Sequence, residues 1–158
     1  MRGDITIQRL NADAPSAEIV ACWTFEAWGH LHPGLTKEQA IARLKAECGH
    51  AGVPTIFVAL SEETPVGTAS LIVDDMSIRR DLTPWLASVF VVPEWRGQGI
   101  ASALVRRVEV EAAENGIERF YLYTPDQQAL YRRFGWQDVE SLEYRGENVT
   151  VMSRQLGL

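Results

Sequence analysis

The most informative segment of the chain is Val91-Val92-Pro93-Glu94-Trp95-Arg96-Gly97-Gln98-Gly99-Ile100-Ala101. It follows a nearly continuous apolar run over residues 85–92, which is typical of a central strand buried on both faces. Beyond it, apolar residues recur every four positions as far as Ala112, opposite Arg107 and Glu111, until Asn115 and Gly116. The sequence therefore predicts a buried strand, a glycine-rich turn and an amphipathic helix in direct succession.

The chemistry of this turn suits a phosphate group. The first N–H groups of a helix have no partner inside the helix, and the helix dipole places about half a positive charge there. Gly97 and Gly99 let the backbone approach an anion, and Arg96 adds a permanent positive charge. Ala101 and Ser102 are small enough to leave the first helical turn open. The segment therefore predicts a cradle for a pyrophosphate.

Two other classes of nucleotide-binding protein are disfavoured because the sequence lacks residues that they require. A dinucleotide-binding fold requires a third Gly or Ala near Ser102 and an acidic residue at the end of the next strand, where Thr124 stands. The phosphate loop of nucleoside triphosphatases requires Gly-Lys followed by Ser or Thr, which the sequence lacks. A glycine pair at the start of a helix can also be a plain tight turn, so the pattern alone does not identify a ligand.

Two motifs in this order resemble the GNAT superfamily of N-acetyltransferases. The family's Arg/Gln-x-x-Gly-x-Gly/Ala signature is matched by Arg96, Gly99 and Ala101, and the segment 91–93 matches its usual Val-x-Pro. Downstream, a second segment is similar to the family's Leu-Tyr-x-x-x-Gly-Phe, with Trp136 in place of Phe: Ala129-Leu130-Tyr131-Arg132-Arg133-Phe134-Gly135-Trp136. The motifs cover about residues 85–137, and elsewhere only the order of the elements is similar.

The resemblance implies acetyl-CoA as co-substrate and no metal. It implies that the backbone of Val91 pairs with the pantetheine arm, in a cleft where strands ending at Val92 and Thr124 splay apart. The pyrophosphate would be held, mainly by backbone amides, by Arg96, Gly97, Gln98, Gly99, Ile100, Ala101 and Ser102.

Tyr131 is the predicted general acid. An unperturbed phenol has a pKa of about 10 against about 8.5 for a thiol, so it stays protonated at neutral pH and can donate to a departing thiolate. On residue type alone a core tyrosine is the commoner role, and the family resemblance reverses that preference. The family often has an Asn early in this motif; Thr124 or Gln127 would replace it here, or no residue does.

The sequence does not single out a general base. Many family members have a Glu on the strand equivalent to residues 85–92, and this strand has no carboxylate. Ser88 would act through a water molecule, and the flanking loops offer Glu26, His30, His32, Asp74, Asp75 and Asp81, each more often a solvated surface residue. The two histidines have the most suitable intrinsic pKa, near 6.5. Three tryptophans are candidates for the wall of an acceptor pocket or for the core: Trp28, Trp85 and Trp95.

The whole chain, residues 1–158, is expected to form one α+β domain, an α/β sandwich around a mixed, mostly antiparallel sheet of six to seven strands with helices on both faces. Strands are expected around Ile5 and at residues 55–60, 66–73, 85–92, 120–123, 136–144 and 148–154. Helices are expected after Pro15, from a capping box at Thr36 and Gln39 to Gly49, from Gly99, and from Thr124. In the last of these, Thr124 is the expected N-cap, with Gln127 as its capping-box partner.

Composition narrows the partners and the location. A net charge of −6 argues against nucleic acid and suits a cationic substrate. No apolar run is long enough to cross a membrane, and the charges at Arg2, Asp4 and Arg9 do not fit a secretory signal, so a cytoplasmic location is expected. Cys22 and Cys48 are expected to be buried reduced thiols.

These observations together predict transfer of an acetyl group from acetyl-CoA to a primary amine, by direct attack within a ternary complex. The acceptor would be a small molecule or a peptide. The sequence leaves the oligomeric state open, and the family resemblance is compatible with a homodimer. The absent strand carboxylate motivates an alternative, a non-catalytic CoA-binding sensory or regulatory module. A nucleotide-dependent oxidoreductase is a third hypothesis.

Overall fold

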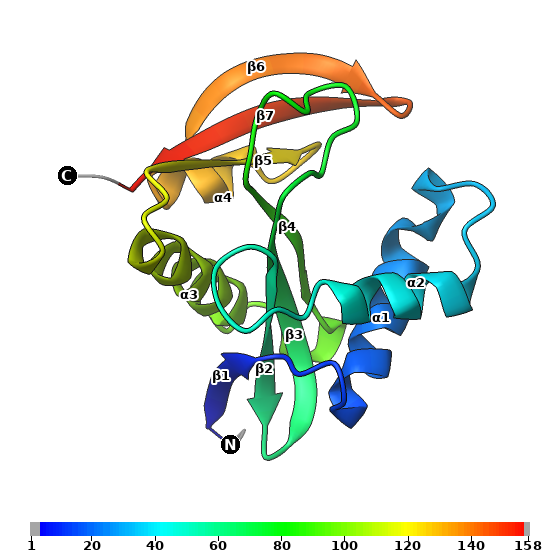
Figure 1. Cartoon of the computed structure of the whole chain (residues 1–158). Coiled ribbons are helices and arrows are strands. Elements are labelled where there is room, and N and C mark those ends of the chain that lie inside the picture. Colours follow the sequence, from blue (N-terminus) through cyan, green and yellow to red (C-terminus); the bar gives the residue numbers. More distant parts are fainter. Residues whose placement is uncertain (1–3, 157–158) are drawn as a thin grey trace.

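The computed structural model describes residues 4–156, and a seven-stranded sheet with helices on both faces dominates it (Figure 1). The ends of the expected domain, Arg2 among them, lie outside the described residues. The strands are β1 (Ile5–Arg9), β2 (Thr55–Ser61), β3 (Thr64–Ile72), β4 (Trp85–Val91), β5 (Arg119–Thr124), β6 (Gln137–Tyr144) and β7 (Glu147–Gln155). The helices are α1 (Pro15–Trp28), α2 (Lys37–Ala46), α3 (Ile100–Glu114) and α4 (Gln128–Arg133), with 3₁₀ turns at Gly29–Leu31 and Pro93–Trp95.

The sheet is mixed and mostly antiparallel, as predicted. Its order is β1-β2-β3-β4-β5-β7-β6, and β4 with β5 is the parallel pair. These two strands are in register only at Trp85 and Tyr121, and they run apart beyond that point (Figure 1). The centre of the sheet therefore splits on one side of β4, which leaves its backbone accessible there.

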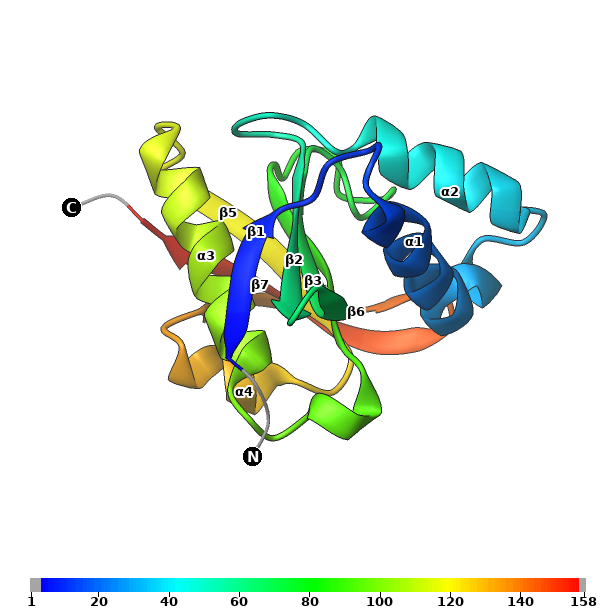
Figure 2. The same cartoon turned by 90° about the horizontal axis from the view of Figure 1, so that it is seen from below.

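The helices cover both faces of the sheet. Figure 2 shows α1 and α2 on one side and α3 with α4 on the other. The apolar stripe of α3, with Leu104 and Val108 fully buried, packs into the main core together with Phe57 and Phe120. The predicted capping box starts α2: the Thr36 hydroxyl accepts a hydrogen bond from the Gln39 N–H at 3.1 Å, and the Gln39 side chain accepts from the Thr36 N–H at 2.9 Å.

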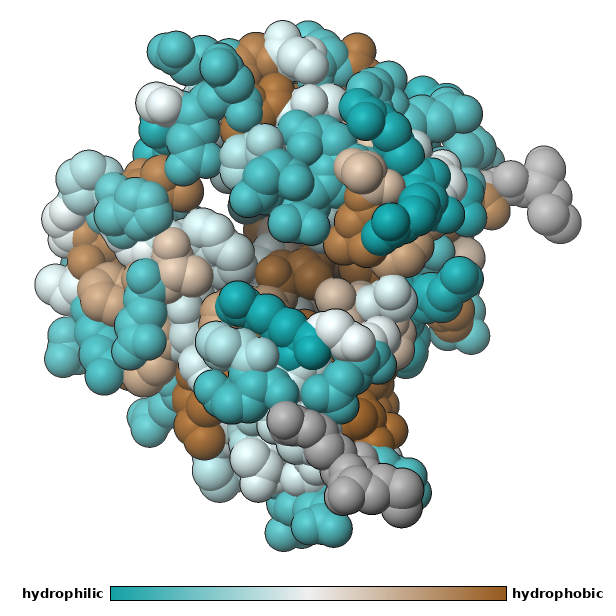
Figure 3. Space-filling model, turned by 180° about the vertical axis from the view of Figure 1, so that it is seen from behind, coloured by the Kyte–Doolittle hydropathy of each residue, from teal (hydrophilic) through white to brown (hydrophobic). Residues whose placement is uncertain are grey.

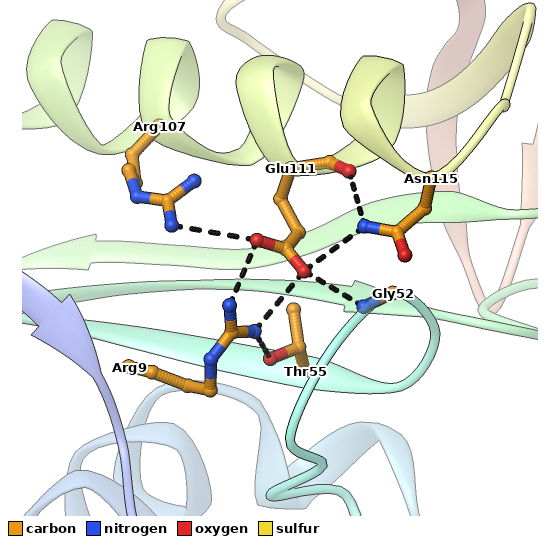
Figure 4. Close-up of polar contacts among 6 residues, drawn as sticks. All are labelled: Arg9, Gly52, Thr55, Arg107, Glu111 and Asn115. Carbon is orange, nitrogen blue, oxygen red and sulfur yellow. Dashed lines mark hydrogen bonds and ion pairs between the residues drawn. The ribbon is translucent and has the colours of Figure 1, made fainter.

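A buried carboxylate on α3 links this helix to β1 and to the segment before β2. Glu111, expected on the polar side of the helix, is only 2% exposed. Figure 4 shows its polar contacts. The carboxylate accepts hydrogen bonds from Arg9 at 2.9 and 3.2 Å, from the Gly52 N–H at 2.7 Å, and from Asn115 at 3.2 Å. Arg107 contacts it at 3.4 Å. The expectation of Glu111 on the polar side of the helix is wrong because the chain supplies these donors, which make burial of the carboxylate tolerable.

Two predicted helix ends are also wrong. α4 begins at Gln128, because the Thr124 hydroxyl accepts hydrogen bonds from the N–H groups of Asp126 and Gln127 at 3.4 and 3.0 Å and so forms a turn. Gln127 is the N-cap and has no side-chain capping bond. α2 ends at Ala46, before the predicted stop at Gly49. Cys22 and Cys48 are free, as predicted, but half-buried.

None of the helices within residues 4–156 combines the length and apolarity needed to cross a membrane.

Candidate functional site

A β-bulge in β4 divides the site. Between the pairs Thr68–Phe90 and Ser70–Ala87, β3 contributes one residue and β4 contributes two, Ser88 and Val89. Ser88 adopts a positive φ of 55°, a conformation that side-chain-bearing residues rarely adopt. A bulge redirects the side chains of its strand, and here its two residues line different cavities, Ser88 the second and Val89 the first described below.

The first cavity, of about 590 Å³, follows the glycine-rich turn, and we call it the turn cavity. Seen from behind, the molecule is hollowed near its middle, and the floor of the hollow is hydrophobic (Figure 3). The structure brings seven of the predicted cofactor-binding residues to this cavity: Val91, Arg96, Gly97, Gly99, Ile100, Ala101 and Ser102. Gln98 is exposed and does not line it. Tyr131, the predicted acid, lies on the α4 side of the cavity.

The turn has the geometry of an anion site. Gly97 and Gly99 have φ of 77° and 84°, which explains why glycine stands at both positions. Gly99 is the N-cap of α3 and provides no side-chain cap, so the first amides of the helix have no partner within it. The Arg96 Nε donates a hydrogen bond to the Val91 carbonyl oxygen at 2.8 Å, which fastens the turn to the end of β4.

The backbone N–H of Val91 faces the gap beside β4. Val91 lies opposite Gly67, and the N–H of Val92 donates to the Val66 carbonyl at 3.0 Å. Because successive N–H groups of an antiparallel strand alternate in direction, the Val91 N–H points away from β3 and toward β5. β5 has already diverged at this level, so a ligand lying in the gap can accept this hydrogen bond.

Tyr131 is held by its ring and leaves its hydroxyl unengaged. The side chain is 7% exposed and contacts Phe134 and Trp136 edge to face, with ring centroids 6.2 and 6.1 Å apart. Burial raises the pKa of Tyr131 to about 12. Among residues 4–156, no hydrogen bond engages its hydroxyl. The phenol is therefore protonated at neutral pH and available to a ligand in the turn cavity.

The other residues predicted near the cofactor or the acceptor lie in different places. Thr124 is buried and uses its hydroxyl in the turn before α4, whereas Gln127 lines the turn cavity. Trp28 lines both cavities, and Trp95 lines the turn cavity. Trp85 is fully buried and donates its indole N–H to the Leu82 carbonyl at 2.7 Å, so of the two roles expected for it, pocket wall or core, it has the core role.

The second cavity, of about 410 Å³, lies against α1 and α2, and we call it the α1–α2 cavity. Four candidate bases line it: His32, Asp74, Asp75 and Ser88. Glu26 and His30 are exposed and do not line it, and Asp81 is bound by Arg79 at 3.1 Å outside it. Burial, then the positive charges of Arg145 and Arg43, lower the pKa of His32, so the imidazole is neutral at pH 7.

Sequence reasoning missed part of this cavity. Glu47, directly after α2, lines it, and so do Arg43, Arg80 and Arg145. Burial raises the pKa of Glu47, and the charge of Arg43 opposes that rise. Nothing in the local sequence marks these residues, because they come from separate elements. Residues 4–156 contain no group of three or more His, Cys, Asp or Glu side chains arranged to hold a metal ion.

Comparison with known proteins identifies the family. The model of the Acetyltransferase (GNAT) family matches residues 17–136. The chain therefore belongs to the GNAT acetyltransferase family, which confirms the resemblance seen in its motifs.

Solved structures share the fold. A GNAT acetyltransferase from Streptococcus pneumoniae superposes with a TM-score of 0.73 at 18% identity, over 98% of this chain and 100% of that one. YncA from Salmonella typhimurium, a structure with its cofactor acetyl-CoA, gives 0.71 at 18% identity over 99% and 96%. An aminoglycoside 6'-N-acetyltransferase complexed with coenzyme A gives 0.74 at 15% identity over 97% and 98%.

Proposed function

We propose that the protein is an N-acetyltransferase that moves an acetyl group from acetyl-CoA to a primary amine. The observation that carries this proposal is the pair of cavities that begin at neighbouring residues of β4, Ser88 and Val89, and share Trp28. A donor in the turn cavity and an acceptor in the α1–α2 cavity would meet at the bulge. Holding two reactants side by side in this way removes most of the entropic cost of their encounter.

The turn cavity fits acetyl-CoA. The free amides at the start of α3 and the guanidinium of Arg96 suit the pyrophosphate, and the Val91 N–H suits the amide-bearing arm. The acetyl-CoA and coenzyme A bound in two proteins of the same fold support this ligand. When bound, acetyl-CoA supplies an acetyl group activated as a thioester.

Tyr131 acts on the leaving sulfur. In direct transfer, the bond between nitrogen and the acetyl carbon forms, the carbon–sulfur bond breaks, and the amine loses a proton. Because the pKa of Tyr131 exceeds that of a thiol, its hydroxyl first stabilises the departing thiolate as a hydrogen-bond donor. Its proton passes to sulfur and is replaced by the one that the amine loses. No covalent acyl-enzyme is needed.

The test combines binding with turnover. Calorimetry on the full chain should detect association with CoA, and an amine library that includes aminoglycosides should release free thiol from acetyl-CoA. Tyr131→Phe keeps the ring packing, so we expect kcat to fall about 10²- to 10⁴-fold while CoA affinity is retained. Tyr121→Phe, a half-buried tyrosine of β5 that lines neither cavity, is the matched control and should keep its rate.

Each outcome has one meaning. The absence of any heat of CoA binding by the folded chain would overturn the proposal. Binding without acetylation of any amine would support the non-catalytic CoA-binding module in its place. The oligomeric state stays open, and light scattering would check whether the chain forms the homodimer that is compatible with the family resemblance.

A further inference from the structure

Asp75 is a carboxylate of the α1–α2 cavity that the transfer described above does not use. It lines this cavity together with Ser88 of the bulge. Met76, the residue after Asp75, is fully buried and belongs to the same apolar cluster as Ala87, the residue before Ser88. The loop that carries Asp75 therefore packs against the part of β4 that carries the bulge.

The neighbours of Asp75 hold it in place and leave its carboxylate free. The Ser77 N–H donates a hydrogen bond to the Tyr144 hydroxyl at 3.0 Å, and the side chain of Met76 is anchored in the apolar cluster. Within the described part of the chain, the side chain of Asp75 makes no hydrogen bond or ion pair. A fixed carboxylate with unused oxygens can accept a proton from a group bound in the cavity.

The surroundings of Asp75 suit this role. Burial, then the negative charge of Glu47, raises the pKa of Asp75 to about 7, and the charges of Arg43 and Arg145 oppose that rise. Burial, then the charge of Asp75, raises the pKa of Tyr123, so Asp75 lies within electrostatic reach of β5, the strand that diverges from β4. A general base is most effective when its pKa lies near the working pH. The other titratable or charged side chains of the cavity are His32, Asp74, Arg80 and Tyr144.

The other candidate bases are less suitable. Three of them do not line the cavity: Glu26, His30 and Asp81. Asp74 pairs with Arg80 at 3.4 Å, so its carboxylate is already engaged. The pKa of His32 is lowered from 6.5, mainly by burial, which makes its imidazole a weaker base than the Asp75 carboxylate. Asp75 is therefore the carboxylate of the original candidates that is in the cavity, unengaged and basic enough.

We propose that Asp75 is the general base of the transfer and takes the first proton from the ammonium group of the acceptor. This inference rests on the proposed function and adds a catalytic residue to it. An ammonium acceptor loses two protons in the reaction. The first passes to Asp75 and from there to solvent, and the neutral nitrogen then forms its bond to the acetyl carbon. As the carbon–sulfur bond breaks and Tyr131 protonates the sulfur, the second proton replaces the one that Tyr131 has given away.

The first test compares pH profiles of kcat/KM for the best acceptor of the amine library, with acetyl-CoA saturating. In the wild type, kcat/KM should fall below about pH 7, because Asp75 is then protonated, and should be level above it. A primary amine has a pKa of about 10, so Asp75→Asn depends on the small neutral fraction of the acceptor. We expect a loss of about 10²-fold or more at pH 8, and a rise of about tenfold per pH unit toward the pKa of the acceptor. A wild-type profile in folded Asp75→Asn overturns the proposal.

Two further variants assign the acid limb of this profile. Glu47→Gln removes the negative charge that raises the pKa of Asp75, so it should move the limb to lower pH. A limb that stays in place would mean that another group titrates there. Asp81→Asn is the matched control, because Asp81 is an exposed carboxylate of the same loop that lines neither cavity. Its profile should equal that of the wild type.

If Asp75→Asn fails to fold, the unaltered full chain decides. The profile is measured for the same acceptor and for a fluorinated analogue, whose amine has a lower pKa. With Asp75 as the base, the acid limb should stay near pH 7 for both acceptors. A limb that follows the pKa of the acceptor sinks the assignment of Asp75 and leaves the enzyme intact, whereas absence of acetylation sinks the proposed function itself.

Discussion

Replacing Glu111 tests the polar network that holds α3 to β1 and to the segment before β2 (Figure 4). Removing one partner of a buried ion pair costs about 3–5 kcal/mol, because the other charge stays uncompensated. The side chains of Arg9 and Arg107 keep 28% and 32% exposure, so water partly replaces the lost carboxylate. We therefore expect Glu111→Ala to lower the free energy of unfolding by about 3 kcal/mol, at the lower end of that range.

Thermal unfolding followed by circular dichroism at pH 7 measures this loss. For a chain of this size, 1 kcal/mol corresponds to about 2–4 °C in Tm, so Glu111→Ala should melt roughly 6–12 °C below the wild type. Glu111→Gln keeps the shape and one acceptor oxygen and should lose about half as much. Glu114→Ala, an exposed carboxylate of the same helix, is the control and should change stability by less than about 0.5 kcal/mol.

The pH dependence gives the same network an independent signature. Burial raises the pKa of Glu111, but the hydrogen bonds from Arg9 and Gly52 and the charges of Arg9 and Arg107 outweigh it, so the pKa is lowered. A carboxyl with a lowered pKa stabilises the fold above its unfolded value, near 4.3, and loses this contribution as the pH falls through the folded value. The wild type should therefore lose more stability than Glu111→Gln below about pH 4.3. Equal stability at pH 7, with parallel acid transitions, would refute the reasoning.

Three further predictions concern other elements. Gly99→Ala places a side chain at φ 84° with no atom within 4 Å, so we expect backbone strain of about 1–2 kcal/mol without a clash. Calorimetry should then measure weaker CoA binding, and unchanged affinity would contradict the role of the turn. Thr36→Ala removes the α2 capping box and should cost about 1 kcal/mol in urea unfolding, whereas Lys37→Ala next to it should be nearly silent. Burial, then the charge of Glu47, raises the pKa of Cys48 to about 11. At pH 8.5, iodoacetamide should therefore alkylate Cys48 roughly 100-fold more slowly than free cysteine, as measured by peptide mass spectrometry. Labelling at the free rate would show that the thiol is not desolvated.

Local patterns predicted the elements that local interactions build. The α3 stripe and the capping box at Thr36 follow from residues within a few positions of each other, and both are as expected. The start of α4 was mispredicted because Thr124 bonds the N–H groups two and three residues on in a turn, which competes with the helix cap. Burial of Glu111 depended on Arg9, more than a hundred residues away, and no helical period could indicate that partner.

For the same reason, the turn cavity could be predicted from the sequence and the α1–α2 cavity could not. The turn cavity is built mainly from residues 89–102, and its polar groups are largely backbone amides, so glycines and a helix start were enough to predict it. The α1–α2 cavity takes His32, Glu47 and Asp75 from three separate segments. The hydroxyl of Tyr144 accepts a hydrogen bond from the Ser77 N–H at 3.0 Å, which ties the β6–β7 hairpin to the loop that carries Asp75.

Because the two cavities are built from different segments, acceptor specificity can change without loss of cofactor binding. The contacts that we assign to the cofactor come from one continuous stretch and Tyr131. The cavity proposed for the acceptor is instead lined by separate loops, which side-chain hydrogen bonds such as that from Arg145 to the Leu31 carbonyl hold together. Substitutions in the segments 73–84 and 144–147 can therefore reshape the α1–α2 cavity without moving Gly97, Gly99 or Arg96.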